Sequence, residues 1–239
     1  MARARLTRSE LKAQDEITTT LERWTESAVA RKGEVITGAI IVVVLAAAFF
    51  GWRYYSSSRN AAAHKELSNV IFAFQDPASK SEKERYEKTI VAAQKTMKDY
   101  PSSSAASLAQ YYLGLSQDGL GDMPNGVKNL EEVIARGDTR TKPIAQFALA
   151  GIYKRNGDLQ KSIDVLKQLD ASGGFSKAAV AYELGSVAEA ADQKDVAQTA
   201  YNKVVTESAD SPFRPEAETA LKRMGLPVPV PAPPQVEVK

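Results

Sequence analysis

The chain has 239 residues, of which 44% are hydrophobic and 25% charged, proportions that exclude both a fully disordered chain and a polytopic membrane protein. It contains no cysteine and one histidine, so it cannot build a disulfide, a thiolate nucleophile or a zinc knuckle from its own side chains. The formal net charge is +2, with both signs interleaved, so we expect no nucleic-acid partner. Because the side chains that usually bind metals are so few, we also expect no metal and no cofactor.

The first segment, residues 1–34, is predicted to be a cytoplasmic tail with an amphipathic helix. Apolar residues recur at helical spacing between charged ones, at Ile17, Leu21, Trp24 and Ala28. Such a helix can lie on a membrane surface or dock on a partner protein. A loosely ordered helix that only supplies positive charge is the alternative interpretation.

Residues 35–55 are predicted to form a transmembrane helix. The run from Val35 to Trp52 contains no charge, and at about 1.5 Å per residue it is roughly as long as a bilayer's hydrocarbon core is thick. Residues suited to the membrane interface flank this run, namely Arg31, Lys32, Trp52, Arg53, Tyr54 and Tyr55. A buried core helix and a cleaved signal peptide are the alternatives.

The distribution of lysine and arginine predicts the orientation of this helix. Residues 1–34 contain seven of them, whereas residues 53–64 contain only Arg53 and Arg59. Because positive charge near a span favours the cytoplasmic side, the amino terminus is expected in the cytoplasm and the rest of the chain outside it.

Residues 56–101 are predicted to comprise a juxtamembrane helix and a degenerate first repeat. Helical patterns cover residues 59–74 and 82–98, and a polar stretch separates them. No glycine or proline interrupts the chain from Arg53 to Phe74, so the first of these helices is expected to continue from the membrane helix.

Residues 102–225 contain three segments that align without gaps, in steps of 36 and 35 residues. Each segment has a large apolar residue followed by a small one, at Leu113-Gly114, Leu149-Ala150 and Leu184-Gly185. Each also has a turn pair, at Gly121-Asp122, Gly157-Asp158 and Asp192-Gln193. The small residue lets two helices approach closely, and the turn pair ends one helix before the next begins.

This pattern resembles the tetratricopeptide repeat, a unit of two antiparallel helices. The resemblance implies an all-α fold in which one transmembrane helix precedes a tetratricopeptide-repeat superhelix of about four helix pairs. A solitary closing helix is expected from Pro215 to Arg223, ending at Gly225. The segment after it, residues 226–239, is rich in proline and is expected to be a disordered tail.

Three aromatic residues occupy the same position in the first helix of each repeat: Tyr111, Phe147 and Tyr182. In tetratricopeptide proteins this position faces the concave groove where peptides bind, so the three rings are the predicted partner-binding residues. Rings of this kind accept an extended chain without requiring a fixed sequence. Ordinary packing between repeats is the alternative.

The remaining polar residues give no reason to expect catalysis. Lys154 and Arg155 could pair with an acidic partner, although such a pair is more often a solvated face, and His64 has no second ligand nearby. The sequence has no phosphate-binding loop, no nucleophile elbow and no HExxH motif. We therefore predict that the protein is not an enzyme and has no small-molecule substrate.

The combination of a cytoplasmic tail, a span ending in GWRYY, an alanine-rich helix and a small repeat domain resembles the YfgM-type ancillary subunits of the SecYEG translocon. The resemblance implies a bacterial inner-membrane protein with its repeats in the periplasm. It further implies three partners, which are SecYEG, a PpiD-type chaperone and newly exported polypeptides. The alternative is a structural scaffold of an envelope complex for secretion, motility or division.

Overall fold

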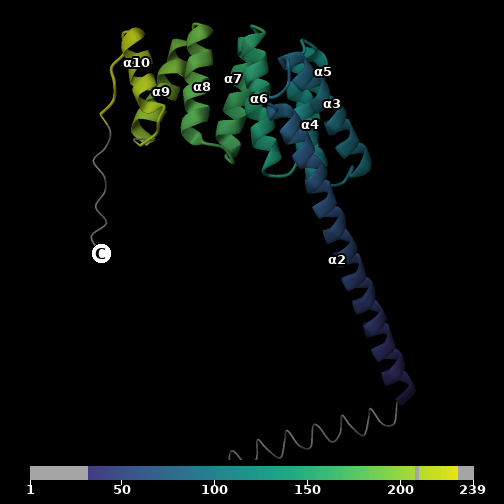
Figure 1. Ribbon diagram of the computed structural model, residues 1–239. Helices are drawn as coiled ribbons and strands as arrows, with labels where there is room; N and C mark the ends of the chain where they lie inside the picture. The colour runs from purple at the N-terminus through teal and green to yellow at the C-terminus, as the bar shows by residue number, and fades with distance from the viewer. Residues whose placement is uncertain (1–31, 208–209, 231–239) are drawn as a thin grey trace, which may run out of the picture. The chain divides into compact units, whose positions relative to one another are not determined.

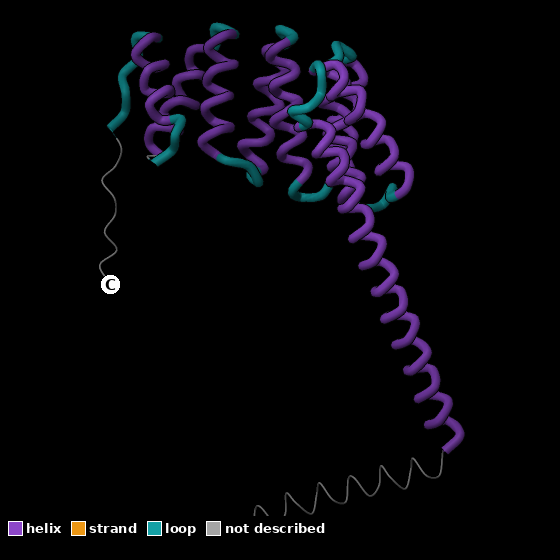
Figure 2. Tube along the Cα trace, in the orientation of Figure 1, coloured by secondary structure: helices purple, strands orange, loops and turns teal. Residues whose placement is uncertain are grey.

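The structure, a computed structural model, describes residues 32–207 and 210–230 (Figure 1). All regular elements in these ranges are α-helices (Figure 2). They are α2 (Lys32–Gln75), α3 (Glu82–Asp99), α4 (Ser104–Gly119), α5 (Met123–Arg136), α6 (Thr141–Arg155), α7 (Leu159–Ser172), α8 (Lys177–Ala190), α9 (Lys194–Glu207) and α10 (Arg214–Arg223). The predicted tail through residue 31, with all of its amphipathic helix, lies outside the described residues, as does the end of the Pro-rich segment from residue 231.

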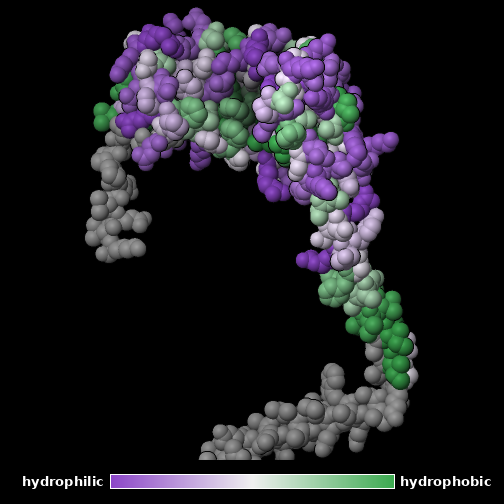
Figure 3. Space-filling model, in the orientation of Figure 1, coloured by the Kyte–Doolittle hydropathy of each residue, from purple (hydrophilic) through white to green (hydrophobic). Residues whose placement is uncertain are grey.

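The chain divides into two compact units, Met1–Ser58 and Arg59–Lys239. The described part of the first unit is the beginning of α2, whose large apolar side chains from Ile36 to Phe50 are all exposed (green in Figure 3). Within the described chain, α2 is the one helix long and apolar enough to cross a membrane, judged by length and composition. It continues without interruption to Gln75, which confirms the predicted continuity between Arg53 and Phe74.

In the second unit the helices follow one another in an antiparallel row, and each packs against the next along the chain (Figures 1 and 2). The end of α2 forms a hairpin with α3 at the positions predicted for the degenerate repeat. Three further hairpins follow, α4 with α5, α6 with α7, and α8 with α9, and the solitary α10 closes the row. The predicted all-α tetratricopeptide-like superhelix is confirmed.

Serine residues cap the beginnings of three of the described helices. Ser81, Ser103 and Ser176 each accept a hydrogen bond from a backbone N–H in the first turn of α3, α4 and α8. This satisfies donors that a helix start otherwise leaves unpaired. At the other end of the unit, α10 stops before Gly225, whose φ is 72°. The closing helix therefore ends at the predicted glycine.

The core consists of three clusters of buried apolar residues arranged along the row. The first joins α2, α3 and α4 through residues such as Leu67, Ala93 and Leu113. The second joins α5 to α6, and the third extends from α6 to α10. Leu226 and Val228, which follow the closing helix, also pack against the third cluster, whereas Val230 is 89% exposed.

In the three hairpins from α4 to α9, a pair of small residues twelve positions apart marks the helix crossing, and direct contacts are seen at the first two pairs. The pairs are Gly114 with Gly126, Ala150 with Ser162, and Gly185 with Ala197. A Cβ on Gly126 would lie 2.9 Å from the carbonyl oxygen of Gly114, so this glycine, where the repeat pattern has alanine, permits a still closer approach. In the next hairpin, the buried Ser162 hydroxyl donates to the Ala150 carbonyl oxygen at 2.8 Å.

The turns between paired helices need a residue in the left-handed backbone region. Gly157 adopts a φ of 83° there, as glycine does at no steric cost. At the equivalent place in the third repeat, Asp192 has a φ of 55°. Aspartate is among the few non-glycine residues that tolerate this conformation, which explains how the turn forms without a glycine.

We predict that Gly185→Ala destabilises the repeat unit by about 2 kcal/mol, because overpacking a core typically costs 1–3 kcal/mol. The added Cβ would lie 2.6 Å from the ring of Tyr201, which is 1% exposed and has no room to move. Gly151→Ala is the matched control, since its Cβ would meet only the Arg155 Nη1 at 3.5 Å. That variant should gain up to about 1 kcal/mol from helix propensity. Urea unfolding followed by circular dichroism measures both; equal effects would contradict the close-approach argument.

Candidate partner-binding surface

The three predicted aromatic residues lie at matching positions on the first helices of their hairpins. Tyr111 is on α4, Phe147 on α6 and Tyr182 on α8, and all three side chains are half-buried. None of the three rings contacts another of the three among the described residues; each contacts a different aromatic neighbour. The rings are therefore three separate surfaces rather than one continuous stack.

Two of the three rings stack against aromatic rings that belong to the connections between hairpins. Phe147 stacks on Phe175 with ring centroids 4.6 Å apart and an interplanar angle of 22°. Tyr182 stacks on Phe213 at 5.4 Å and 20°, and it also contacts Tyr201 at 5.9 Å. Phe175 and Phe213 each lie just before or at the start of the next helix. Packing between repeats thus accounts for one face of each of these two rings.

Tyr111 has a different environment, because its ring neighbour is on its own helix. It meets Tyr112 edge-on at 5.3 Å, and Tyr112 contacts Phe74 at 5.1 Å. Phe74 in turn contacts Tyr86 at 6.0 Å, so four rings form a connected series that ends at Tyr111. Burial raises the pKa of the Tyr111 hydroxyl above its usual value, in keeping with the packing of this residue against the cluster that joins α5 to α6.

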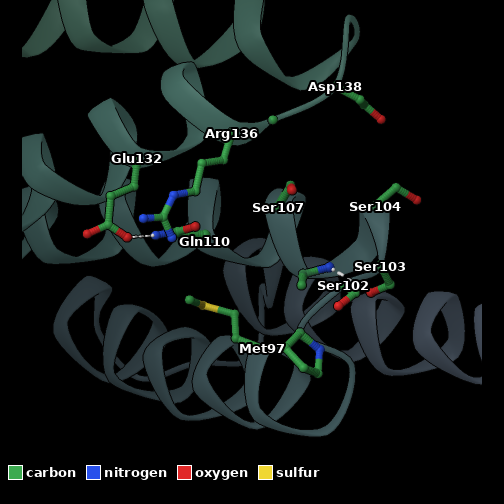
Figure 4. A pocket seen from close by; sticks show the side chains of 12 residues that line it. Met97, Ser102, Ser103, Ser104, Ser107, Gln110, Glu132, Arg136 and Asp138 are labelled. Atoms are coloured by element: carbon green, nitrogen blue, oxygen red, sulfur yellow. Dashed lines mark hydrogen bonds between the residues drawn. The ribbon is translucent and has the colours of Figure 1, made fainter.

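A cavity of about 510 Å³ opens beside α4 (Figure 4). It is bounded by the connection before α4, by one face of α4, and by the end of α5 with the residues that follow. Its lining includes Met97, Ser107, Gln110, Arg136 and Asp138. Sequence reasoning missed this cavity, since nothing in the repeat pattern distinguishes the first repeat as open.

The polar groups of the cavity are only partly satisfied by one another. The Gln110 amide donates to Glu132 at 2.6 Å (dashed in Figure 4). Asp138 accepts the backbone N–H groups of Arg140 and Thr141, and the second of these bonds is the main reason that the pKa of its carboxyl is lowered. Arg136 makes no ion pair within the described part of the chain. The cavity can therefore offer one guanidinium to a ligand while its acids remain occupied.

Partly exposed ion pairs link neighbouring hairpins. Lys154 pairs with Glu183 on α8 at 2.9 Å, and Arg155 pairs with Asp118 on α4. Lys203 likewise reaches Asp170 at 2.6 Å. Lys154 and Arg155 therefore each have an acidic partner in an adjacent repeat, and the Arg155 side chain is also largely exposed.

A small polar network joins α8, α9 and α10 at the end of the row. Glu189 accepts from the Arg223 guanidinium at 2.7 Å and from the Tyr201 hydroxyl at 2.9 Å. The bond from Arg223 is the main cause that lowers the pKa of the Glu189 carboxyl. Burial, followed by the hydrogen bond to Glu189, strongly raises the pKa of Tyr201. This network attaches the closing helix to the last hairpin.

The predicted membrane-interface residues lie near the two ends of the apolar part of α2. Arg31 lies outside the described residues, and Lys32 is the first residue of the helix. Trp52 is 69% exposed, Tyr54 79% and Tyr55 59%, and Arg53 is exposed as well. Among the described residues no three His, Asp or Glu side chains are grouped so that they could hold a metal ion.

Comparison with known proteins identifies the repeat architecture. The model of the family described as "Tetratricopeptide repeat-like domain" matches residues 30–224. The nearly identical TPR-like repeats of a Podosopora anserina protein assigned as a kinesin light chain superpose with a TM-score of 0.52 and 18% identity, covering 70% of this chain and 88% of that one. A single-residue variant of that protein matches equally, with 87% of its chain covered.

A crystal structure of MamA is also similar, at 23% identity and a TM-score of 0.48, over 59% of this chain and 80% of that chain. At these identities the likeness concerns the fold alone. No curated protein sequence matches the chain.

The lowered pKa of Glu189 predicts acid sensitivity at the closing helix. A carboxyl whose folded-state pKa lies below its usual 4.5 contributes stability above that value and loses it as the pH falls through the folded pKa. Glu189→Gln should therefore reduce the loss of stability between about pH 5 and pH 3, a window set by the ordinary glutamate pKa and its lowering. Urea unfolding across this range measures the slope. Glu207→Gln, at an exposed position on α9, is the control and should leave the slope unchanged.

Proposed function

The chain belongs to the tetratricopeptide repeat-like domain family, and on this premise we propose that it is a membrane-anchored adaptor that binds polypeptides on its repeat unit. The family's fold indicates a role in protein–protein interaction. The observation that carries the proposal is the presence, on one chain, of this repeat unit and of a helix whose apolar segment is exposed on every side. Such a segment is costly in water and needs lipid or protein to cover it.

The lipid bilayer is the environment that suits this segment best. Its apolar side chains face all directions, so a protein partner would have to surround it, whereas lipid does so without specific contacts. Aromatic and basic side chains at its end, Trp52, Arg53 and Tyr54, suit the polar interface. The excess of lysine and arginine in residues 1–34 supports an amino terminus in the cytoplasm and repeats on the other side of the membrane.

For the finer function we propose an ancillary subunit of the SecYEG translocon of the YfgM type, in the bacterial inner membrane with its repeats in the periplasm. The resemblance in residues 33–205, together with the aromatic surfaces at Tyr111, Phe147 and Tyr182, supports this assignment. Half-buried rings suit a partner that is extended and variable in sequence. Newly exported chains have these properties, and a PpiD-type chaperone would receive them next.

The orientation is testable with single-cysteine variants, because the natural chain has no cysteine to interfere. We expect that a membrane-impermeant maleimide, added to cells with a permeabilised outer membrane, labels Lys194→Cys but not Ser9→Cys. Lys194 is exposed at the start of α9, and residue 9 lies in the predicted cytoplasmic tail. Detergent lysis before labelling is the control and should make both variants react. Labelling of Ser9→Cys alone in intact cells would contradict the proposed orientation.

The partner assignment is testable by photo-crosslinking in cells. A photoreactive phenylalanine analogue is placed separately at Tyr111, Phe147 and Tyr182, and crosslinked products are identified by mass spectrometry. We expect many exported polypeptides from at least one position, and SecYEG in a parallel purification in mild detergent. The control position is Lys167, which is exposed on the second helix of its hairpin. A single stoichiometric partner set without SecYEG would instead establish the scaffold function.

A further inference from the structure

The closing helix α10 ends in the same turn as the first helix of each hairpin from α4 to α9. In this turn a left-handed residue is followed by one whose N–H donates to the carbonyl oxygen five positions back. The left-handed residues after α4, α6, α8 and α10 are Gly121, Gly157, Asp192 and Gly225. After α10 the Leu226 N–H donates to the Leu221 carbonyl oxygen at 2.9 Å. The second helices α5 and α7 end instead with a bond four positions back, so α10 corresponds to the first helix of a fourth repeat.

No second helix follows α10 within the described chain. After α4, α6 and α8, the second helix begins two residues beyond the left-handed one. After Gly225, residues 226–230 form no regular secondary structure, and Pro227 and Pro229 alternate with apolar residues. Proline has no N–H to donate, and it disfavours helical backbone in the residue before it. The fourth repeat is therefore represented by its first helix alone.

The helix α10 also lacks the small residue that admits a second helix. In the three hairpins this residue lies seven positions before the left-handed one, at Gly114, Ala150 and Gly185. Glu218 occupies that position in α10, and its carboxylate accepts from the Arg214 Nε at 2.8 Å. A side chain of this length keeps another helix away from the α10 backbone. A second helix therefore cannot pack on α10 as it does in the preceding hairpins.

The apolar side chains of α10 are nevertheless buried, among them Ala217 and Leu221. Part of their cover comes from the residues after the turn, because Leu226 and Val228 pack against the same cluster. Pro227 between them is exposed, as expected for an extended backbone whose side chains alternate. We call residues 226–228 the covering segment; it lies at the end of the row, next to α10 (Figure 1).

We propose that the covering segment substitutes for the missing second helix and closes the end of the repeat unit to a second copy of the chain. A stack of repeats needs a cap at its last unit, because the uncovered face is apolar. The occupant that this cap excludes is a hairpin of a second copy, since hairpins of this chain already pack on one another along the row.

The first hairpin of a second copy is the one that fits the uncovered end. It begins the row, and it carries two largely exposed apolar side chains, Phe72 on α2 and Val91 on α3. Apolar surface on both partners favours association. Contact between the end of one copy and the beginning of the next does not close on itself, so it would add copies without a fixed limit.

The contact made by the covering segment is testable by cysteine labelling, because the natural chain contains no cysteine. The variants Val228→Cys and Val230→Cys are compared in the full chain in detergent micelles. We expect maleimide to react with Val228→Cys about tenfold more slowly, since its side chain must first leave the cluster. In urea the two rates should be equal. Equal rates in the folded protein would overturn the proposal.

The consequence for self-association is tested by removing the apolar side chains of the covering segment. In Leu226→Asp with Val228→Asp, we expect the mass measured by light scattering, after subtraction of the detergent, to rise at least about twofold with protein concentration. Val230→Asp is the matched control and should keep the mass of the natural chain at all concentrations. Adding Phe72→Asp and Val91→Asp to the double variant should abolish the increase.

Circular dichroism and urea unfolding show whether each variant is folded. If the double aspartate variant does not unfold cooperatively, Leu226→Ser with Val228→Ser is measured in its place. A folded variant of the covering segment that keeps the mass of the natural chain would overturn the proposal. Association that persists after Phe72→Asp and Val91→Asp would overturn the assignment of the first hairpin as the excluded occupant.

Discussion

The close approach of two helices at one pair of small residues is the contact on which the repeat unit depends. In the hairpins of α4 with α5 and of α6 with α7, the members of this pair lie in direct contact, as Gly126 does with the Gly114 carbonyl and Ser162 with the Ala150 carbonyl. Large side chains then fill the space on either side of the crossing, such as Leu130, Leu166 and Tyr201. Successive hairpins pack against one another along the row, and their buried residues form three adjacent clusters.

The segments that connect successive hairpins take no part in the helix crossing. Their residues differ from one repeat to the next. The second and third connections carry a ring that covers the preceding first helix, and the first connection does not. Ion pairs such as Lys154 with Glu183 add contacts between neighbouring hairpins. Each such pair is partly exposed, so its contribution to stability is modest, but its position fixes how the hairpins align. The cavity beside α4 in the first repeat is thus an exception within an otherwise repeated arrangement.

The sequence predicted the elements well because their causes are local. The helices predicted at residues 82–98 and 215–223 follow from apolar periodicity, the cap at Ser81 and the glycine at position 225, all of which act within a few residues. The repeat period could be recognised because each unit must contain the same small residue at the crossing. Even the turn without glycine was located correctly, since Asp192 occupies the expected place.

The contacts of the candidate surface could not be predicted in the same way, because they join residues that are far apart in sequence. Phe175 reaches Phe147 only through the conformation of two glycines, and neither residue shows this from its own neighbourhood. Arg155 and Asp118 are 37 positions apart, a separation that becomes meaningful only once the repeat length is known. An aromatic residue just before each following helix was the available signal for the stacked rings.

Weak contacts at the three predicted aromatic rings are adequate if the protein works where we propose. Half-buried rings give little affinity by themselves, since immobilising a flexible chain opposes them. A receptor held in the same membrane as the source of its ligand meets that ligand at an effective concentration far above the bulk value, which raises occupancy without any new contact. Weak binding also permits release to the next partner, because affinity differences lie mainly in the dissociation rate. Tethering and modest ring affinity are therefore complementary properties, and the exposed apolar segment of α2 supplies the first while the half-buried rings supply the second.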